Sequence, residues 1–278
     1  MEKLKRIDVV DLLPSLDSLL IKLLEGLDPK DWDRQTIAPQ WKVKDVAVHL
    51  LDGNLRTLSM LRDRYYGEPA EHIHSYQDLV HFLNQLNADW VKATRRLSPR
   101  VIIDLLKTSG QEYCQFLSTL NPGDKAEFSV AWAGEQLSQN WFHIAREYTE
   151  KWHHQQQIRL AVQKEDVLLK HQWYFPYLDT SIRALPHHYR DTAGKPGEVI
   201  KFRFIGETEK NWFLCYDGGW QLATRVDEKP VCEVSIADEY AWRIFTKGMK
   251  KEKAIKSSKI VGKQELGLRI FDMIAVMA

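Results

Sequence analysis

The sequence predicts an α plus α+β protein of two parts: an antiparallel four-helix bundle over residues 1–165 and a small α+β domain over residues 166–278. Two observations predict this fold class. As far as residue 164, long stretches carry apolar residues at the three- and four-residue spacing of amphipathic helices. Beyond it come four short strand-like runs, and helical stretches follow them.

The composition narrows the class of protein. Hydrophobic residues at 44% and charged residues at 28% are those of a globular chain. A formal charge of +1 argues against a nucleic-acid partner, since such binders carry a basic excess. No apolar run approaches the ~20 residues that span a bilayer, so no membrane partner is expected. Cys114, Cys215 and Cys232 are widely spaced and odd in number, which predicts no disulfide framework and favours a cytoplasmic location.

Each helix of the first part is predicted from its apolar spacing together with its caps and breakers. Pro14 interrupts the first helix near its start. Ser75 caps the third helix, and Ser98 with Pro99 opens the fourth as a cap and first-turn residue. Modest loops join the segments, which favours antiparallel neighbours in a bundle. The predicted helices cover residues 8–27, 41–66, 75–97, 98–120 and 135–162.

The second part is predicted from a change in pattern. An aromatic-rich helix over residues 171–189 is limited by Pro176 and Pro186. The tripeptide DGG at residues 217–219 is a hairpin signal between two strands. A lysine cluster, residues 247–259, is interpreted as a solvated loop. The remaining predicted elements are strands over residues 199–205, 212–216, 220–226 and 231–236, and helices over residues 238–245 and 264–276.

The stretch from residue 140 to residue 162 carries the chemistry. At helical spacing a polar stripe lies on one face, beside an apolar stripe of aromatic residues that anchors the helix in a core. Buried carboxylate, imidazole and amide groups are costly unless something satisfies them. The polar stripe contains His143, Glu147, Glu150, His154 and Gln157.

A metal ion is one way to satisfy this stripe. Glu150 and His154 are four residues apart and so leave the helix on the same side, and His49 on the second helix offers a third ligand. Two imidazoles and one carboxylate form a ligand set that binds zinc or non-haem iron and leaves a position open. His153, rotated by about 100° from His154, ranks below it. Alternatively these are ordinary polar residues, with Glu150 paired at the surface with Lys151 or Arg146.

Two segments carry a family resemblance. WKVKDVAVHLLDGN (residues 41–54) resembles the second-helix signature of the DinB-like superfamily, and EKWHHQQQIR (residues 150–159) resembles the mycothiol-dependent maleylpyruvate isomerase branch. WQLATRV, ADEYAWRIFTKG and IVGKQELGLRIFDMIAV, within residues 220–276, are similar to the sterol-carrier-like domain fused behind that bundle. The resemblance implies that His49, Glu150 and His154 bind a divalent metal. Zinc is the usual ion, with nickel, iron or manganese as alternatives. The chain departs from the branch at Gln157 and Lys263, where acidic residues are common.

The expected function is therefore a thiol-dependent isomerase or S-transferase that acts on a small electrophilic substrate, with a low-molecular-weight thiol as second cofactor. The alternative is a non-catalytic metal- or ligand-binding protein, which a fourth ligand from His143 or Glu147 would favour. Catalytic residues are not assigned, and the sequence leaves the oligomeric state open. Arginines that could bind an anionic substrate are Arg56, Arg146, Arg225 and Arg243. The residues expected to line the site are His143, Glu147, Gln157, Asn54 and Arg56.

Overall fold

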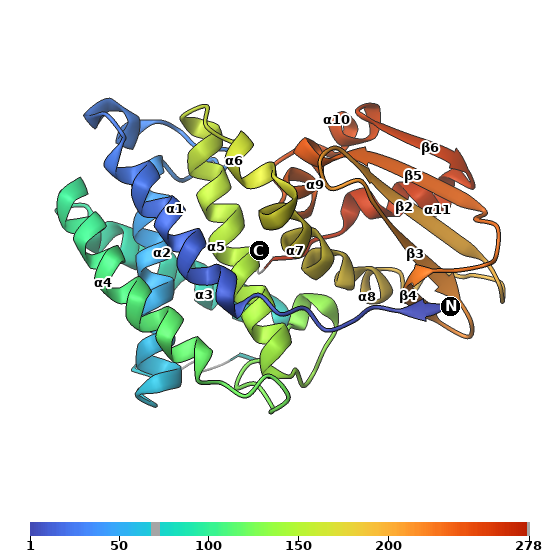
Figure 1. The fold of residues 1–278 in the computed structure, drawn as a ribbon, viewed down its shortest axis with the longest axis horizontal. Helices are drawn as coiled ribbons and strands as arrows, with labels where there is room; N and C mark the ends of the chain where they lie inside the picture. Colours follow the sequence, from blue (N-terminus) through green and yellow to red (C-terminus); the bar gives the residue numbers. More distant parts are fainter. Residues whose placement is uncertain (68–72, 277–278) are drawn as a thin grey trace. The chain divides into compact units, whose positions relative to one another are not determined.

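A computed structural model describes residues 1–67 and 73–276 (Figure 1). The chain forms two compact units. The bundle unit comprises residues 8–127 and 150–165, and the sheet unit comprises residues 1–7, 128–149 and 166–278. Helix α5 (Asn140–Ala161) contributes its first ten residues to the sheet unit and the rest to the bundle unit. The fold is thus helical followed by α+β, as predicted, whereas the domain boundary at residue 165 stays a prediction.

Two helices of the bundle unit begin at the N-cap residues that the sequence predicts. Ser75 and Ser98 accept hydrogen bonds from the backbone N–H groups of Asp78 and Val101, so both predicted N-caps are present. Asp45 accepts a hydrogen bond from the backbone N–H of Lys42, three residues before it. The helices are α1 (Leu13–Glu25), α2 (Val43–Thr57), α3 (Tyr76–Thr94) and α4 (Pro99–Ser118).

Three of the predicted helix boundaries were wrong, including the start of α5, which begins at Asn140 and not at residue 135. Helix α1 begins at Leu13 because Pro14 suits a first turn, and residues 10–12 form a 3₁₀ turn instead. Helix α2 ends at Thr57 and continues as one π-helical turn over Leu58–Arg62 rather than as α-helix to Tyr66.

The core of the bundle unit is built from the apolar faces of α1, α2 and α4 and the last turns of α5. Leu20, Val46 and Ile102 are each buried there, and Ile158 brings α5 into the same cluster. Fully burying one such side chain contributes roughly 1.5–3 kcal/mol. This packing fixes α5 beside α2 and so determines which side chains of the two helices can meet.

The sheet unit contains a six-stranded mixed sheet in the order β1-β4-β3-β2-β5-β6. Strands β2 and β5 pair in parallel, and the other neighbours are antiparallel. The DGG tripeptide forms the predicted hairpin between β3 and β4, with Gly218 in the left-handed region at φ +68°. The strands are β1 (Glu2–Lys3), β2 (Val199–Ile205), β3 (Lys210–Tyr216), β4 (Trp220–Arg225), β5 (Cys232–Ala237) and β6 (Ser258–Gly262).

Short helices accompany the sheet, and three predictions about them were wrong. Pro176 lies inside α7 (His171–Ser181) instead of limiting it, and a 3₁₀ turn separates α7 from α8 (Leu185–His188). The lysine cluster is not a loop, because burial of Ala254 anchors α10 (Lys251–Lys256) and the chain then enters β6. The closing helix divides into α11 (Gln264–Leu268) and a 3₁₀ turn. Helices α6 (Asp166–Leu169) and α9 (Asp238–Phe245) complete the unit.

Among the described residues, no helix is long and apolar enough to cross a membrane.

Candidate metal centre

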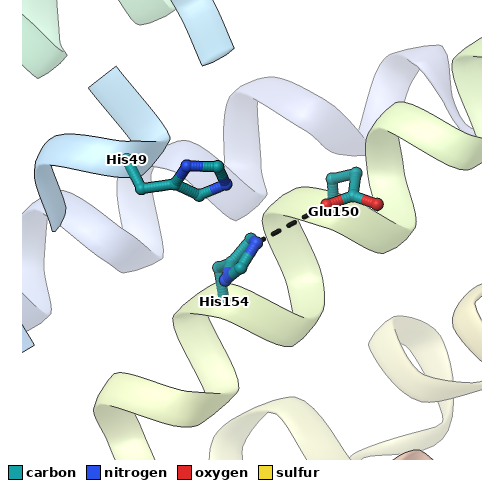
Figure 2. A group of neighbouring side chains, drawn as sticks. All are labelled: His49, Glu150 and His154. Carbon is teal, nitrogen blue, oxygen red and sulfur yellow. Dashed lines mark ion pairs between the residues drawn. The ribbon is translucent and has the colours of Figure 1, made fainter. Parts of the chain in front are cut away.

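Three side chains from two helices converge in the bundle unit (Figure 2). His49 lies on α2, and Glu150 and His154 lie one turn apart on α5. One ligand atom from each of them lies within 4.8 Å of the other two. The structure thus brings together the three ligands predicted from the sequence, and within the described part of the chain this is the group with the spacing of a metal site.

Aromatic packing holds the two imidazoles in place. The rings of His49 and His154 meet edge to face with their centroids 4.5 Å apart. The indole of Trp41, just before α2, packs on His49 at 4.7 Å and reaches His154 at 5.9 Å. Trp41 therefore packs against both imidazole rings and restricts their rotation. The ring of His153 is tilted by 37° against that of His154, with the centroids 3.9 Å apart, but His153 is not part of the three-residue group.

The environment of His49 favours its neutral form. Withdrawal of the ring from water lowers its pKa well below the usual value, and the neighbouring His154 and Arg56 lower it further. The carboxylate of Glu150 acts in the opposite direction but does not prevail. The Nδ1 atom of His49 is buried and has no hydrogen-bond partner among the described residues. A neutral imidazole is the form that coordinates a metal ion, so His49 suits that role at neutral pH.

His154 is oriented from both sides. Its Nδ1 atom lies 3.0 Å from Oε1 of Gln157, one turn further along α5. Its Nε2 atom lies 3.5 Å from Oε2 of Glu150, one turn before it. The His154 side chain is 10% exposed and that of Glu150 is 30% exposed, so the group is largely enclosed but open on the carboxylate side.

The other predicted lining residues have different surroundings. Asn54 is buried and bonds to Lys151 and Ser109. Arg56 pairs with Asp52 at 2.8 Å, and its charge still acts on His49.

His143 and Glu147 belong to the sheet unit, where both contact Arg146 at distances of 3.1 and 2.5 Å. Neither is included in the three-residue group. Their expected role in lining the site stays a prediction.

Sequence reasoning missed a buried polar network beside the site. Lys151 is buried and does not lie at the surface. Its Nζ atom lies 2.9 Å from Asp17 and 2.7 Å from Asn54, and it lies over the ring of Tyr113 at 4.3 Å. The signal was present in the spacing, since Lys151 follows the buried Tyr148 by three residues and so lies on its face of the helix. A buried lysine needs a carboxylate partner, and Asp17 on α1 supplies it.

The sequence of the bundle also matches a family model. Residues 13–159 match the mycothiol maleylpyruvate isomerase N-terminal domain. The chain belongs to this family. The match spans more than half of the chain and includes His49, Glu150 and His154.

Solved structures with a similar fold were also found. Two are crystal structures of the mycothiol-dependent maleylpyruvate isomerase, one of them of a point mutant. Each is 8% identical, has a TM-score of 0.49, and aligns over 84% of this chain and 86% of its own. No curated protein matches the sequence of this chain.

Proposed function

We propose that the chain is a metal-dependent enzyme that uses a low-molecular-weight thiol to isomerise a small electrophilic substrate of the maleylpyruvate type. One observation carries the proposal. This chain belongs to the mycothiol maleylpyruvate isomerase N-terminal family, and the ligand atoms of its His49, Glu150 and His154 lie within 4.8 Å of one another. Two neutral imidazoles and one carboxylate are a donor set typical of catalytic zinc sites.

The residues present fit a divalent ion. The neutral ring of His49 and the Nε2 atom of His154, which faces Glu150, are available as ligands. An ion bound there supplies Lewis acidity and lowers the pKa of a coordinated thiol toward neutrality. Around it, Trp41 packs against both imidazole rings, and the partly exposed Glu150 leaves the carboxylate side accessible.

The thiol must come from outside the chain. Burial raises the pKa of Cys114 to about 12 and that of Cys232 to about 11, and it also raises the pKa of Cys215. A thiol with such a pKa is almost entirely protonated near neutral pH, and the thiolate is the nucleophile. The three cysteines of this chain are therefore poor nucleophiles, in agreement with use of a small cosubstrate.

The reaction that this arrangement supports is reversible addition. The sulfur of the thiolate adds to the electrophilic carbon of a cis double bond conjugated to a carbonyl, and the π electrons move onto the carbonyl oxygen. The former double bond then rotates as a single bond. Return of the electrons expels the thiolate and leaves the trans isomer. Retention of the sulfur, with protonation of the adjacent carbon, would give an S-transferase instead.

The position of Arg56 favours a substrate with a negative charge. Its guanidinium is held by Asp52 and by the side chain of Asn87, and it is 32% exposed. Its electrostatic effect on His49 indicates that it lies near the site. A guanidinium in that place suits a substrate carboxylate.

The direct test is an assay of the zinc-loaded protein with maleylpyruvate and a panel of thiols that includes mycothiol and glutathione. We expect isomerisation that needs both metal and thiol, and that falls at least a hundredfold in Glu150→Gln. The exposed histidine on α3, changed in His81→Ala, is the matched control and should leave the rate unchanged. Binding of metal and thiol without turnover of this substrate would support the alternative, a non-catalytic binding protein.

A further inference from the structure

We propose that Gln157 is a positioning residue that sets the tautomer of His154 and, being neutral, leaves the metal centre selective for an anionic sulfur ligand. The inference rests on the proposed function and adds to it a residue that is not itself a metal ligand.

The contact that carries the inference is short and buried. Oε1 of Gln157 lies 3.0 Å from Nδ1 of His154, and the two residues are only 6% and 8% exposed. Both lie on α5, three residues apart, so the helix itself maintains the contact. A carbonyl oxygen can only accept a hydrogen bond, and Nδ1 of His154 must therefore carry the proton.

That choice of tautomer decides whether His154 can bind a metal. In a neutral imidazole with its proton on Nδ1, the lone pair lies on Nε2, which is the nitrogen that faces Glu150 at 3.5 Å. With the proton on Nε2, the same nitrogen would present N–H to the carboxylate and could not coordinate. Partners beyond the ligands commonly fix histidine tautomers in this way.

The neutral charge of Gln157 has a second effect. Two neutral imidazoles and one carboxylate reduce a divalent ion to a net charge of +1, and the amide of Gln157 adds nothing. A carboxylate in its place would bring a negative charge behind His154 and weaken the attraction for an anion. The charge of Arg56, which acts on His49, reinforces the positive character of the centre.

The chain supplies its own control next to Gln157. Gln156 is also fully buried, but its amide donates to the backbone carbonyl of Glu165. Gln156→Leu therefore removes a buried glutamine contact of the same helix without touching His154. Gln157→Leu removes the acceptor for Nδ1, and the isosteric Gln157→Glu keeps the acceptor and adds a charge.

The first test needs no metal. Nitrogen-15 NMR of the histidine side chains reports the tautomer of His154, assigned with His154→Ala. We expect the Nδ1–H form in the parent protein and in Gln156→Leu, and a loss of this preference in Gln157→Leu. An Nε2–H tautomer in the parent protein would overturn the inference.

The second test measures affinities with cobalt(II) as the spectroscopic probe. We expect Gln157→Leu to bind cobalt 10–100-fold more weakly than the parent protein, the usual effect of losing such a partner. Gln157→Glu should bind cobalt at least as tightly as the parent but should bind mercaptoethanol, read from the sulfur-to-cobalt charge-transfer band, at least fivefold more weakly.

Each outcome has a distinct meaning. Equal cobalt affinity of the parent protein and Gln157→Leu, or equal thiol affinity of the parent and Gln157→Glu, would overturn the role of Gln157 while leaving the proposed function intact. A parent protein that binds no cobalt would overturn both. Circular dichroism of each variant verifies that the helices are retained.

Discussion

Replacement of Lys151 by methionine should destabilise the bundle strongly. The Nζ atom of Lys151 lies 2.9 and 3.2 Å from the two carboxylate oxygens of Asp17 and 2.7 Å from Oδ1 of Asn54, and the residue is only 7% exposed. Lys151→Met fills a similar volume but leaves the carboxylate of Asp17, whose side chain is only 17% exposed, without its cation. Breaking a buried pair from one side typically costs about 3–5 kcal/mol.

The assay is urea unfolding followed by circular dichroism. We expect the free energy of unfolding of Lys151→Met to fall by about 3 kcal/mol or more. Lys22→Met, at an exposed position on α1, should change it by less than about 0.5 kcal/mol.

A double variant separates the missing charge from general damage. Lys151→Met combined with Asp17→Leu removes both charges together, and replacing both members of a buried pair by apolar groups is often close to neutral. We therefore expect the double variant to be more stable than Lys151→Met alone. A Lys151→Met variant within 1 kcal/mol of the parent would refute the reasoning, because the pair would then contribute little.

Three further predictions follow from buried groups and backbone geometry. Because burial raises the pKa values of Cys114, Cys215 and Cys232, the folded protein should react with iodoacetamide at pH 8 much more slowly than the protein in urea, and rapid alkylation of the folded protein would contradict this. Burial lowers the pKa of His143 to about 4, so between pH 6.5 and pH 4 this imidazole binds a proton in the unfolded chain but not in the folded protein. Stability should then fall by up to about 3 kcal/mol between pH 6.5 and pH 4, and His143→Gln should flatten this slope. Gly134 lies at φ +82°, and a Cβ added there would meet the ring of His187 at 2.3 Å. Gly134→Ala should therefore lower the free energy of unfolding in urea by about 2 kcal/mol or more. An unchanged value would show that the turn relaxes.

Local features of this chain were predictable because their causes are local. Ser75 and Ser98 were recognised as caps since each needs only a backbone N–H three residues later. The four-residue spacing of Glu150 and His154 likewise fixes their shared side of α5 without reference to any other element.

Features that depend on distant partners were not predictable in the same way. Strand β1 has only two residues and exists because it pairs with β4, more than two hundred residues later. Lys151 was considered only as one possible surface partner of Glu150, and its pairing with Asp17 was missed because Asp17 lies on another helix, 134 residues away in sequence. The meeting of His49 with His154 required the order of the helices in the bundle, which the spacing of one helix does not contain. Gln157 was expected to line the site, but its bond to Nδ1 of His154 depends on a side-chain rotamer that only the structure gives.

If the side chains of His49, Glu150 and His154 bind one metal ion, the zinc content of the purified protein must depend on them. The parent protein, His49→Ala, His154→Ala and the surface control His81→Ala would be loaded with zinc, passed over a desalting column and measured by elemental analysis. We expect close to one zinc per chain in the parent protein and in His81→Ala, and almost none in the two site variants. Equal zinc in all four proteins would contradict it.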